Sequence, residues 1–255
     1  MSSLTDHSII ITGASKGIGA ATARHLAGLG AAVTLAARDG TAITQIAAEI
    51  ETAGGKALAV PCDVSDLAAV RALIAATRER FGTVHGLVNN AGVIDPIARL
   101  GDSDPEQWAK VVDVNFKGVY YAVHAALPVM LARGGGTIIN ISSGAATGSL
   151  EGWSHYCATK AAVLSLTRCI DKEYRAQGIR VVGLSPGTVA TDMQRQIKAS
   201  GVNPVSQLDF SVHIPPEWVA QAIAYLAGPG ADRHLGTDFS LKTSEGRAEV
   251  GLPGV

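Results

Sequence analysis

The sequence predicts an α/β fold in which a doubly wound parallel sheet of about seven strands lies between two layers of helices. Two observations predict it. Short apolar runs recur along the chain, and the segments between them have the spacing of amphipathic helices. The runs are apolar without strict alternation, as expected for strands that helices cover on both faces.

The expected strands are short and evenly distributed. They are 8–12, 32–37, 57–62, 84–90, 137–142, 180–185 and, shorter, 237–241. The helices expected between them cover 17–30, 41–55 and 65–82, then about 105–131 and 153–177. Ser65 or Asp66 is placed as an N-cap, and Asp104 precedes Pro105 as cap and first helical residue.

The composition excludes several classes of protein. The chain has 255 residues, of which 47% are hydrophobic and 17% charged, and its net charge of −1 argues against nucleic acid or an anionic membrane as the main partner. No run reaches the roughly 18 apolar residues of a membrane span, and the N-terminus has no signal-peptide pattern. The three cysteines show no metal-ligand spacing, which favours the reducing cytoplasm.

Connections between the expected elements are short, so one domain over 1–255 is the economical interpretation. The exception is 194–216, whose pattern is mixed. We expect it to form a mobile flap over a site.

A glycine-rich turn follows the first strand. In "TGASKGIG" the glycines Gly13, Gly17 and Gly19 lie between a strand and a helix. Glycines let the backbone approach a diphosphate, and the helix N-terminus offers free N–H groups and a positive dipole end. This context predicts a dinucleotide cofactor.

The end of the second strand decides which cofactor. Asp39 lies about 20 residues past Gly19, the separation typical of an acidic residue that binds the ribose of NAD. However, the strand is expected to end at Ala37, so Arg38 is the first side chain beyond it and Asp39 is better placed as a helix cap. Arg38 and Lys16 together favour the 2′-phosphate of NADP(H) over NAD(H).

The chain resembles the short-chain dehydrogenase/reductase family in its compact form, which has a Rossmann-like fold. The motifs that carry the resemblance are "TGASKGIG" (12–19), "NNAG" (89–92), "VNFKG" with Asn115, "NISS" (140–143), "YCATK" (156–160) and "PGTVATD" (186–192), in the family's order. They cover residues 8 to about 193.

The resemblance implies a catalytic set of Asn115, Ser143, Tyr156 and Lys160. Tyr156 is expected to be the general acid or base, and Lys160, one helical turn away, to lower its pKa from about 10. Ser143, rather than Ser142, is expected to hold the substrate oxygen. Asn115 is expected to interrupt its helix and hold a water that links Lys160 to solvent.

The resemblance also implies cofactor contacts. Asp63 is expected to accept a hydrogen bond from the adenine amino group beside Val64, while Val189 and Thr191 hold the carboxamide. The full predicted set, from the glycine turn, the second strand and the resemblance, is Gly13, Ser15, Lys16, Gly17, Ile18, Gly19, Arg38, Asp63, Val64, Asn90, Ala91, Gly92, Tyr156, Lys160, Pro186, Gly187, Val189 and Thr191.

The sequence says less about the substrate than about the reaction. The resemblance places the pocket wall at Ile94, Ala145, Leu150 and Trp153, which are apolar. Since 144–154 contains no Arg or Lys, we expect a neutral, fairly hydrophobic ketone or secondary alcohol. His155 points about 100° away from Tyr156 on the same helix, so we expect a structural role for it.

The C-terminal part departs from the family, many of whose members end with an acidic "DGG"-like turn. Here "KTSEGRAEVG" is expected to form a short exposed helix or tail, with a role left open. By resemblance, the long helices pair subunits into a homotetramer or homodimer.

Three alternatives stay open. They are an NAD-dependent hydroxysteroid or polyol dehydrogenase, a 3-oxoacyl-carrier-protein reductase, which needs a basic docking surface, and a cofactor-sensing regulator without turnover.

Overall fold

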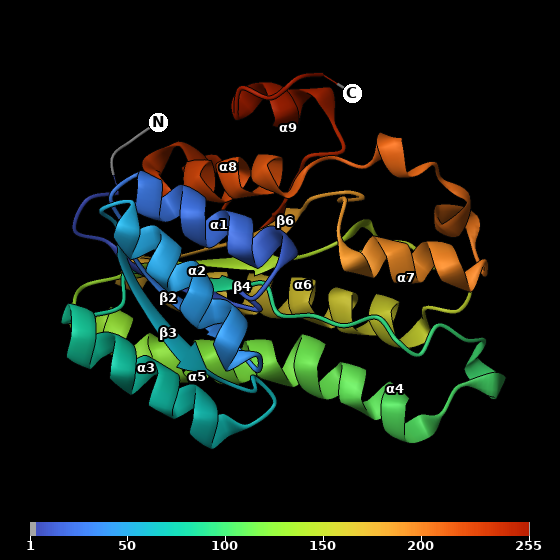
Figure 1. The fold of residues 1–255 in the computed structure, drawn as a ribbon, viewed down its shortest axis with the longest axis horizontal. Helices are drawn as coiled ribbons and strands as arrows, with labels where there is room; N and C mark the ends of the chain where they lie inside the picture. Colours follow the sequence, from blue (N-terminus) through green and yellow to red (C-terminus); the bar gives the residue numbers. More distant parts are fainter. Residues whose placement is uncertain (1–3, 255) are drawn as a thin grey trace.

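The computed structural model describes residues 4–254, and its centre is a parallel sheet (Figure 1). The seven strands follow the order β3-β2-β1-β4-β5-β6-β7. Their bounds are β1 Ser8–Thr12, β2 Ala32–Ala37, β3 Lys56–Pro61, β4 Gly86–Asn89, β5 Gly136–Ile141, β6 Ile179–Ser185 and β7 Asp238–Ser240. The predicted fold class is confirmed. The predicted bounds of β1 and β2 are met at both ends, and the ends of the other strands differ by at most two residues.

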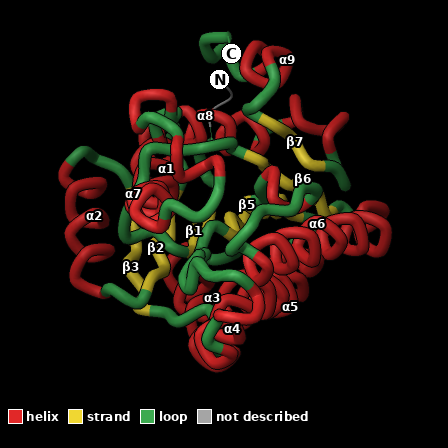
Figure 2. The backbone as a smooth tube through the Cα atoms, turned by 90° about the vertical axis from the view of Figure 1, so that its right-hand side faces the viewer, coloured by secondary structure: helices red, strands yellow, loops and turns green. Residues whose placement is uncertain are grey.

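Helices cover both faces of the sheet, and Figure 2 shows the strands between the two layers. Side chains of α1, α2 and α8 pack with Ile9 and Ile11 of β1 on one face, and those of α3, α5 and α6 pack with Ile10 on the other. The bounds are α1 Gly17–Gly28, α2 Gly40–Thr52, α3 Leu67–Phe81, α4 Pro105–Val112, α5 Gly118–Ala132, α6 Ser154–Tyr174, α7 Asp192–Ser200, α8 Pro216–Ala227 and α9 Ser244–Glu249. Because both faces are covered, the strands are apolar on both sides.

Three predicted helix caps are confirmed. Asp39, Asp66 and Asp104 each accept a hydrogen bond from a backbone N–H in the first turn of the helix that follows. The helix expected over 105–131 is interrupted, because Asp113–Lys117 forms a π-helical turn between α4 and α5. This interruption contains Asn115, as predicted.

The strand order places the loops that matter at one edge of the sheet. The chain runs from β1 outward to β3 and then crosses back to β4 on the other side of β1. In a doubly wound sheet, ligands bind at the carboxyl ends of the strands beside this reversal. Three predicted site residues, Asn115, Tyr156 and Lys160, lie within helical segments. Every other one lies in a loop, or at the start of a helix, that follows one of the first six strands.

Residues 194–216 are more regular than expected. They contain most of α7 and two short 3₁₀ turns, Pro204–Gln207 and Phe210–Val212. Asn203 Nδ2 donates to the carbonyl of Glu151 at 3.1 Å, so this segment packs on the loop after β5.

The C-terminal segment contains the expected short helix, α9, beside α8 (Figure 1). Val250 and Leu252 are buried in the core on the α1 face, and the Arg247 guanidinium lies 5.3 Å from the Trp218 ring centroid. The segment therefore closes one end of the core and is not a free tail. Among the described residues, every helix is too short or too polar to span a lipid bilayer.

Candidate active site

The glycine-rich turn between β1 and α1 has the geometry that a diphosphate requires. Gly13 and Gly17 have φ values of +65° and +54°, which residues with a side chain rarely adopt. A Cβ on Gly13 would lie 2.8 Å from the Cα of Ala91. No side chain caps the first turn of α1 at Lys16, so its N–H groups face outward. These residues fit a dinucleotide.

The "NNAG" segment after β4 is hydrogen-bonded to the end of β1 and to this turn. Asn90 Nδ2 donates to the carbonyls of Thr12 at 2.9 Å and Gly13 at 3.1 Å, and Thr12 Oγ1 accepts from the N–H groups of Asn90 and Ala91. Asn90 therefore has a structural role in the turn besides the predicted proximity to a cofactor.

The tips of β2 and β3 lie side by side. Arg38 is exposed, and Asp39 is bound as a cap to the N–H of Ala42 at 3.0 Å. The pKa of Asp63 is lowered, mainly because Ser65 donates to its carboxylate and to a smaller extent because Arg38 is near. Val64 packs against Gly118 of α5.

Lys16 is not a free positive charge. Its Nζ lies 2.8 Å from Asp192 Oδ2, and Arg195 binds the other oxygen at 2.6 Å. Gly17 also faces Thr191, since a Cβ there would lie 3.1 Å from the Thr191 methyl group. The start of α7 is thus joined to the glycine-rich turn. Lys16 was expected to bind the phosphate of the cofactor, and in this structure its ammonium group is bound to Asp192.

The loop after β6 approaches the same place. Pro186 is buried, Gly187 has a φ of +81°, and Val189 pairs with Ile214 in an isolated β-bridge. Thr191 Oγ1 donates to the carbonyl of Val189. The loop is therefore anchored at Val189, and it follows β6, the neighbour of β5 in the sheet.

Ser143, Tyr156 and Lys160 meet at the end of β5. Ser143 hydrogen-bonds with the Tyr156 side chain and accepts from the N–H of Ala145 at 3.2 Å. Lys160 Nζ lies 5.5 Å from the Tyr156 ring centroid and donates to the carbonyl of Ile141 at 2.6 Å. The structure brings three of the four predicted catalytic side chains together.

The expected lowering of the Tyr156 pKa is wrong for this structure. Burial raises the pKa of Tyr156 to about 12, and the hydrogen bond with Ser143 only partly opposes this. Burial also lowers the pKa of Lys160 to about 8. Desolvation disfavours the charged form of both groups and is the largest cause of each change.

Asn115 is buried and fixed to the loop after β4. Its Oδ1 accepts from the N–H of Val93 at 2.8 Å, and its Nδ2 donates to the carbonyl of Val93 at 2.8 Å. The side chain therefore positions Val93 and its neighbour Ile94. The predicted water relay stays a prediction.

The predicted pocket wall forms one apolar cluster around Tyr156. Ile94, Ala145 and Trp153 are buried in it, and Leu150 packs against it. The Trp153 and Tyr156 rings meet edge to face with centroids 5.6 Å apart. Sequence reasoning gave only a range for the flap; the structure adds Ile197 and Val205 from it to the pocket wall, and Met193 directly before it.

Two neighbours that sequence reasoning set aside have structural roles. Ser142 Oγ donates to Asp238 Oδ2 at 3.0 Å, which confirms that it points away from the site. His155 is buried with Nε2 2.7 Å from the carbonyl of Ile94, as expected of a structural histidine. Asp238 was missed; its signal is a carboxylate at the start of the short last strand.

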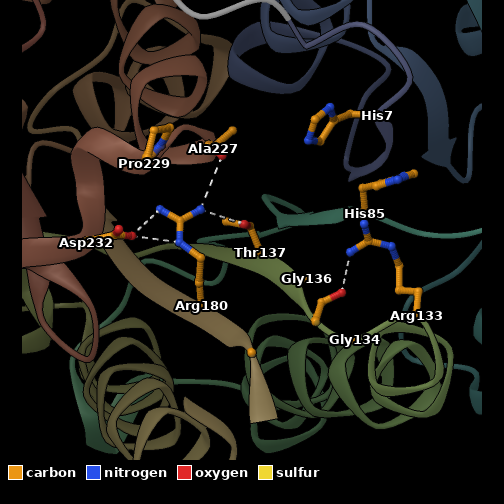
Figure 3. Close-up of a pocket in the computed structure, with 12 residues that line it drawn as sticks. His7, His85, Arg133, Gly134, Gly136, Thr137, Arg180, Ala227, Pro229 and Asp232 are labelled. Carbon is orange, nitrogen blue, oxygen red and sulfur yellow. Dashed lines mark hydrogen bonds and ion pairs between the residues drawn. The ribbon is translucent and has the colours of Figure 1, made fainter. Parts of the chain in front are cut away.

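A hollow of about 400 Å³ at the opposite edge of the sheet is separate from this site (Figure 3). His7, His85, Arg133 and Arg180 line it. Arg180 binds Asp232 at 2.8 Å and also donates to Thr137 and to two backbone carbonyls. Arg180 therefore links the amino ends of β5 and β6. None of the residues that line this hollow is a predicted site residue.

Comparison with known proteins agrees with this geometry. The family model for short chain dehydrogenases matches residues 7–201. A 3-oxoacyl-[acyl-carrier-protein] reductase of Synechocystis sp. is 36% identical over 94% of this chain and 97% of its own. A cis-4-hydroxycyclohexanecarboxylate dehydrogenase of Sinomonas cyclohexanicum is 37% identical over 91% and 93%. The crystal structure of the KRED1-Pglu enzyme superposes with a TM-score of 0.83 at 28% identity, covering 91% of this chain and 99% of that one.

Proposed function

The chain belongs to the short-chain dehydrogenase family, and from this premise we propose that it transfers a hydride between NADP(H) and the carbonyl or secondary alcohol of a fairly hydrophobic small molecule. The observation that carries the proposal is the contact of Ser143 with Tyr156 beside Lys160, at the edge of the sheet where the glycine-rich turn lies. A bound nicotinamide supplies or takes up the hydride.

The residues of this chain supply the proton and the position. With a pKa of about 12, Tyr156 is protonated at neutral pH and is suited to donate its proton to a carbonyl oxygen. Ser143 Oγ, which hydrogen-bonds the same phenol, is placed to hold that oxygen as negative charge develops on it. Lys160 carries its proton less firmly than a free lysine, because its pKa is about 8. In this proposal it resupplies Tyr156, and Asn115 keeps the loop at Val93 in place.

The preference for NADP(H) is supported by the exposed Arg38 at the tip of β2 and by the commitment of Asp39 to capping α2. The cofactor contacts named above are proposed as one surface along the carboxyl edge. If the protein turns over its substrate faster with NAD(H) than with NADP(H), the NAD-dependent alternative is favoured instead.

A 3-oxoacyl-carrier-protein substrate is a second candidate, favoured by the relative from Synechocystis that carries this name. A regulator without turnover is the remote candidate. One relative, 38% identical over 83% of this chain, is named an inactive 2-(S)-hydroxypropyl-CoM dehydrogenase. The complete set Asn115, Ser143, Tyr156 and Lys160 favours turnover here.

We further propose a homotetramer or homodimer in the cytoplasm, with the chain as one domain and 194–216 as the substrate flap. The three cysteines are free, as a reducing compartment allows. Light scattering at several concentrations tests the assembly.

A panel of ketones and alcohols, assayed with NADP(H) and NAD(H), tests the function. We expect turnover with cyclic ketones, and we expect Tyr156→Phe to keep cofactor affinity within about twofold while losing at least roughly 100-fold in kcat, since general acid catalysis contributes about that much or more. Unchanged turnover by Tyr156→Phe contradicts the mechanism. Cofactor binding without turnover of any substrate favours the regulator.

A further inference from the structure

The C-terminal segment brings a positive charge to the mouth of the apolar pocket. Lys242 follows β7, and its side chain crosses the loop after β6 toward the loop after β5. A Cβ on Gly187 would lie 3.1 Å from its Cγ, and a Cβ on Gly144 would lie 3.3 Å from its Nζ. Because neither glycine has a side chain, the lysine stem can lie across Gly187 and place the ammonium group at Gly144.

This position adjoins the reacting centre. Gly144 directly follows Ser143, which hydrogen-bonds Tyr156, and Ala145 is buried in the apolar cluster with Trp153. Gly144 and Lys242 are both exposed. The ammonium group therefore lies at the solvent side of the pocket wall, where a substrate that places its carbonyl at Ser143 must extend.

The charge of Lys242 is not neutralised by the protein. Within residues 4–254, its Nζ forms no ion pair with a carboxylate. The acidic side chains that follow β5 and β6 around the pocket are already paired: Glu151 binds Arg99 at 2.6 Å, and Asp192, at the start of α7, binds Lys16 and Arg195.

The phosphates of a dinucleotide do not explain this lysine. The glycine-rich turn follows β1, and β4, β5 and β6 lie between β1 and β7. At about 4.8 Å per strand, the end of β7 is roughly 19 Å from the end of β1, and the ammonium group, which reaches Gly144 after β5, is roughly 10 Å from it. Lys242 belongs to the half of the edge that carries the apolar pocket.

Two buried polar groups of the same wall also lack acceptors. Trp153 Nε1, in the apolar cluster, has no hydrogen-bond partner among the described residues. Gln194 Nε2 is likewise unpartnered, on the buried face of α7 that also carries Ile197. Both are donors, as is the ammonium group of Lys242, so a substrate that satisfies this wall carries acceptor oxygens.

We propose that Lys242 is a specificity-determining residue that binds an anionic group, such as a carboxylate, on the substrate. The substrate class is then an apolar ketone or secondary alcohol with an acidic substituent away from the reacting carbon. This proposal rests on the proposed oxidoreductase function. It revises the neutral substrate that was expected from the sequence of 144–154 alone. Lysine suits this role because its ammonium is a compact charge on a flexible stem.

A matched pair of ketones tests the proposal. Cyclohexanone and 4-oxocyclohexanecarboxylate differ only in the carboxylate, and both are assayed with wild type, Lys242→Met, Lys242→Arg and the control Lys56→Met. Lys56 is exposed at the start of β3. We expect Lys242→Met to lower kcat/KM for the carboxylate by roughly 10-fold or more, since hydrogen bonds between charged groups are worth about that factor. We expect cyclohexanone to change by less than about twofold, Lys242→Arg to keep most of the preference, and Lys56→Met to change neither.

Binding is measured separately, so that the proposal does not depend on turnover. Cyclohexanecarboxylate, which has no carbonyl to reduce, is titrated into the cofactor-loaded protein by calorimetry at low and high salt. We expect it to bind wild type more tightly than Lys242→Met, with the difference shrinking at high salt. Equal affinities, or an equal loss of kcat/KM for both ketones in Lys242→Met, overturn the proposal. Failure of every variant and wild type to turn over any ketone counts against the proposed function instead.

Discussion

Asp238 accepts a hydrogen bond at 3.0 Å from the Oγ of Ser142, which directly precedes Ser143, the residue that contacts Tyr156. Its second oxygen, Oδ1, is buried with no partner among the described residues, and Gly183 provides the space for it, since a Cβ there would lie 2.6 Å away. Burial raises the pKa of Asp238 to about 6, although Ser142, Lys160 and Arg168 each favour its charged form. A buried carboxylate with one unpartnered oxygen thus lies near the ends of β5 and β6 and near Lys160.

Asp238→Asn is expected to stabilise the protein at pH 8. The folded pKa of about 6 exceeds the ordinary aspartate value of 3.8, so the folded state binds more protons than the unfolded state between these values. Stability from this group therefore falls as the pH rises through this window, and the cost is fully present above about pH 7. We expect Asp238→Asn to gain on the order of 1–2 kcal/mol at pH 8 and little at pH 4, measured by urea unfolding.

Ser142→Ala is the matched variant, because it leaves Asp238 without its donor. It is expected to lose roughly 1 kcal/mol at pH 8 and less at low pH. A gain in Ser142→Ala, or a loss in Asp238→Asn at pH 8, contradicts the assignment of Asp238 as a destabilising buried charge.

Features that depend on residues close together in the sequence were predicted from it. Contacts between residues far apart in the sequence were not. The caps Asp39, Asp66 and Asp104 depend on a backbone N–H two or three residues away, so the sequence contains the whole signal. The interruption at Asn115 was expected only through the family resemblance, and the structure shows its form as a π-helical turn.

The sign of the Tyr156 pKa change could not be obtained from its spacing to Lys160. The spacing places the two groups one turn apart, but burial by Trp153, Ile94 and Ile197 decides the outcome, and these come from three separate segments. Lys242 beside Gly144 is the same kind of case. The two residues are far apart in sequence and meet only because β5, β6 and β7 are neighbours.

Arg38→Asp is expected to reverse the cofactor preference. The exposed guanidinium at the tip of β2 is the only side chain there that we assign to the 2′-phosphate, and an acidic residue repels that group and suits a ribose hydroxyl. We expect the ratio of kcat/KM for NADP over NAD to fall by roughly 10-fold or more. Arg71→Asp, at an exposed position of α3, is the control. A ratio that changes equally in both variants removes the argument for phosphate recognition.

Asn115→Ala is expected to destabilise the protein and loosen the loop after β4. The substitution leaves the N–H and the carbonyl of Val93 without the partners that Asn115 provides at 2.8 Å. Two such losses cost about 2–4 kcal/mol, measured by urea unfolding. Because Val93 precedes Ile94 in the pocket wall, we also expect a higher KM for ketones. An unchanged unfolding midpoint would show that water replaces the amide without loss.

Asp192→Asn is expected to speed cofactor release with little effect on folding. Asp192 is exposed, and its pKa is lowered first by the hydrogen bond from Lys16 and then by Arg195. Exposed pairs of this kind add little to stability. This one, however, joins the glycine-rich turn to the start of α7, so its loss frees the flap above the proposed cofactor surface. We expect the NADPH dissociation rate, followed by fluorescence in stopped flow, to rise by roughly 2- to 5-fold.

The charge on Asp192 gives this prediction a second readout. Protonation of the carboxylate removes both pairs, so the wild-type dissociation rate is expected to approach that of Asp192→Asn as the pH falls toward and below the lowered pKa. Asp209→Asn is the control, since Asp209 is an exposed carboxylate bound to Ser211 within the flap and not to the glycine-rich turn. If Asp209→Asn accelerates release as much as Asp192→Asn, the effect comes from a loosened flap in general. If neither variant does, the ion pair with Lys16 has no part in holding the cofactor.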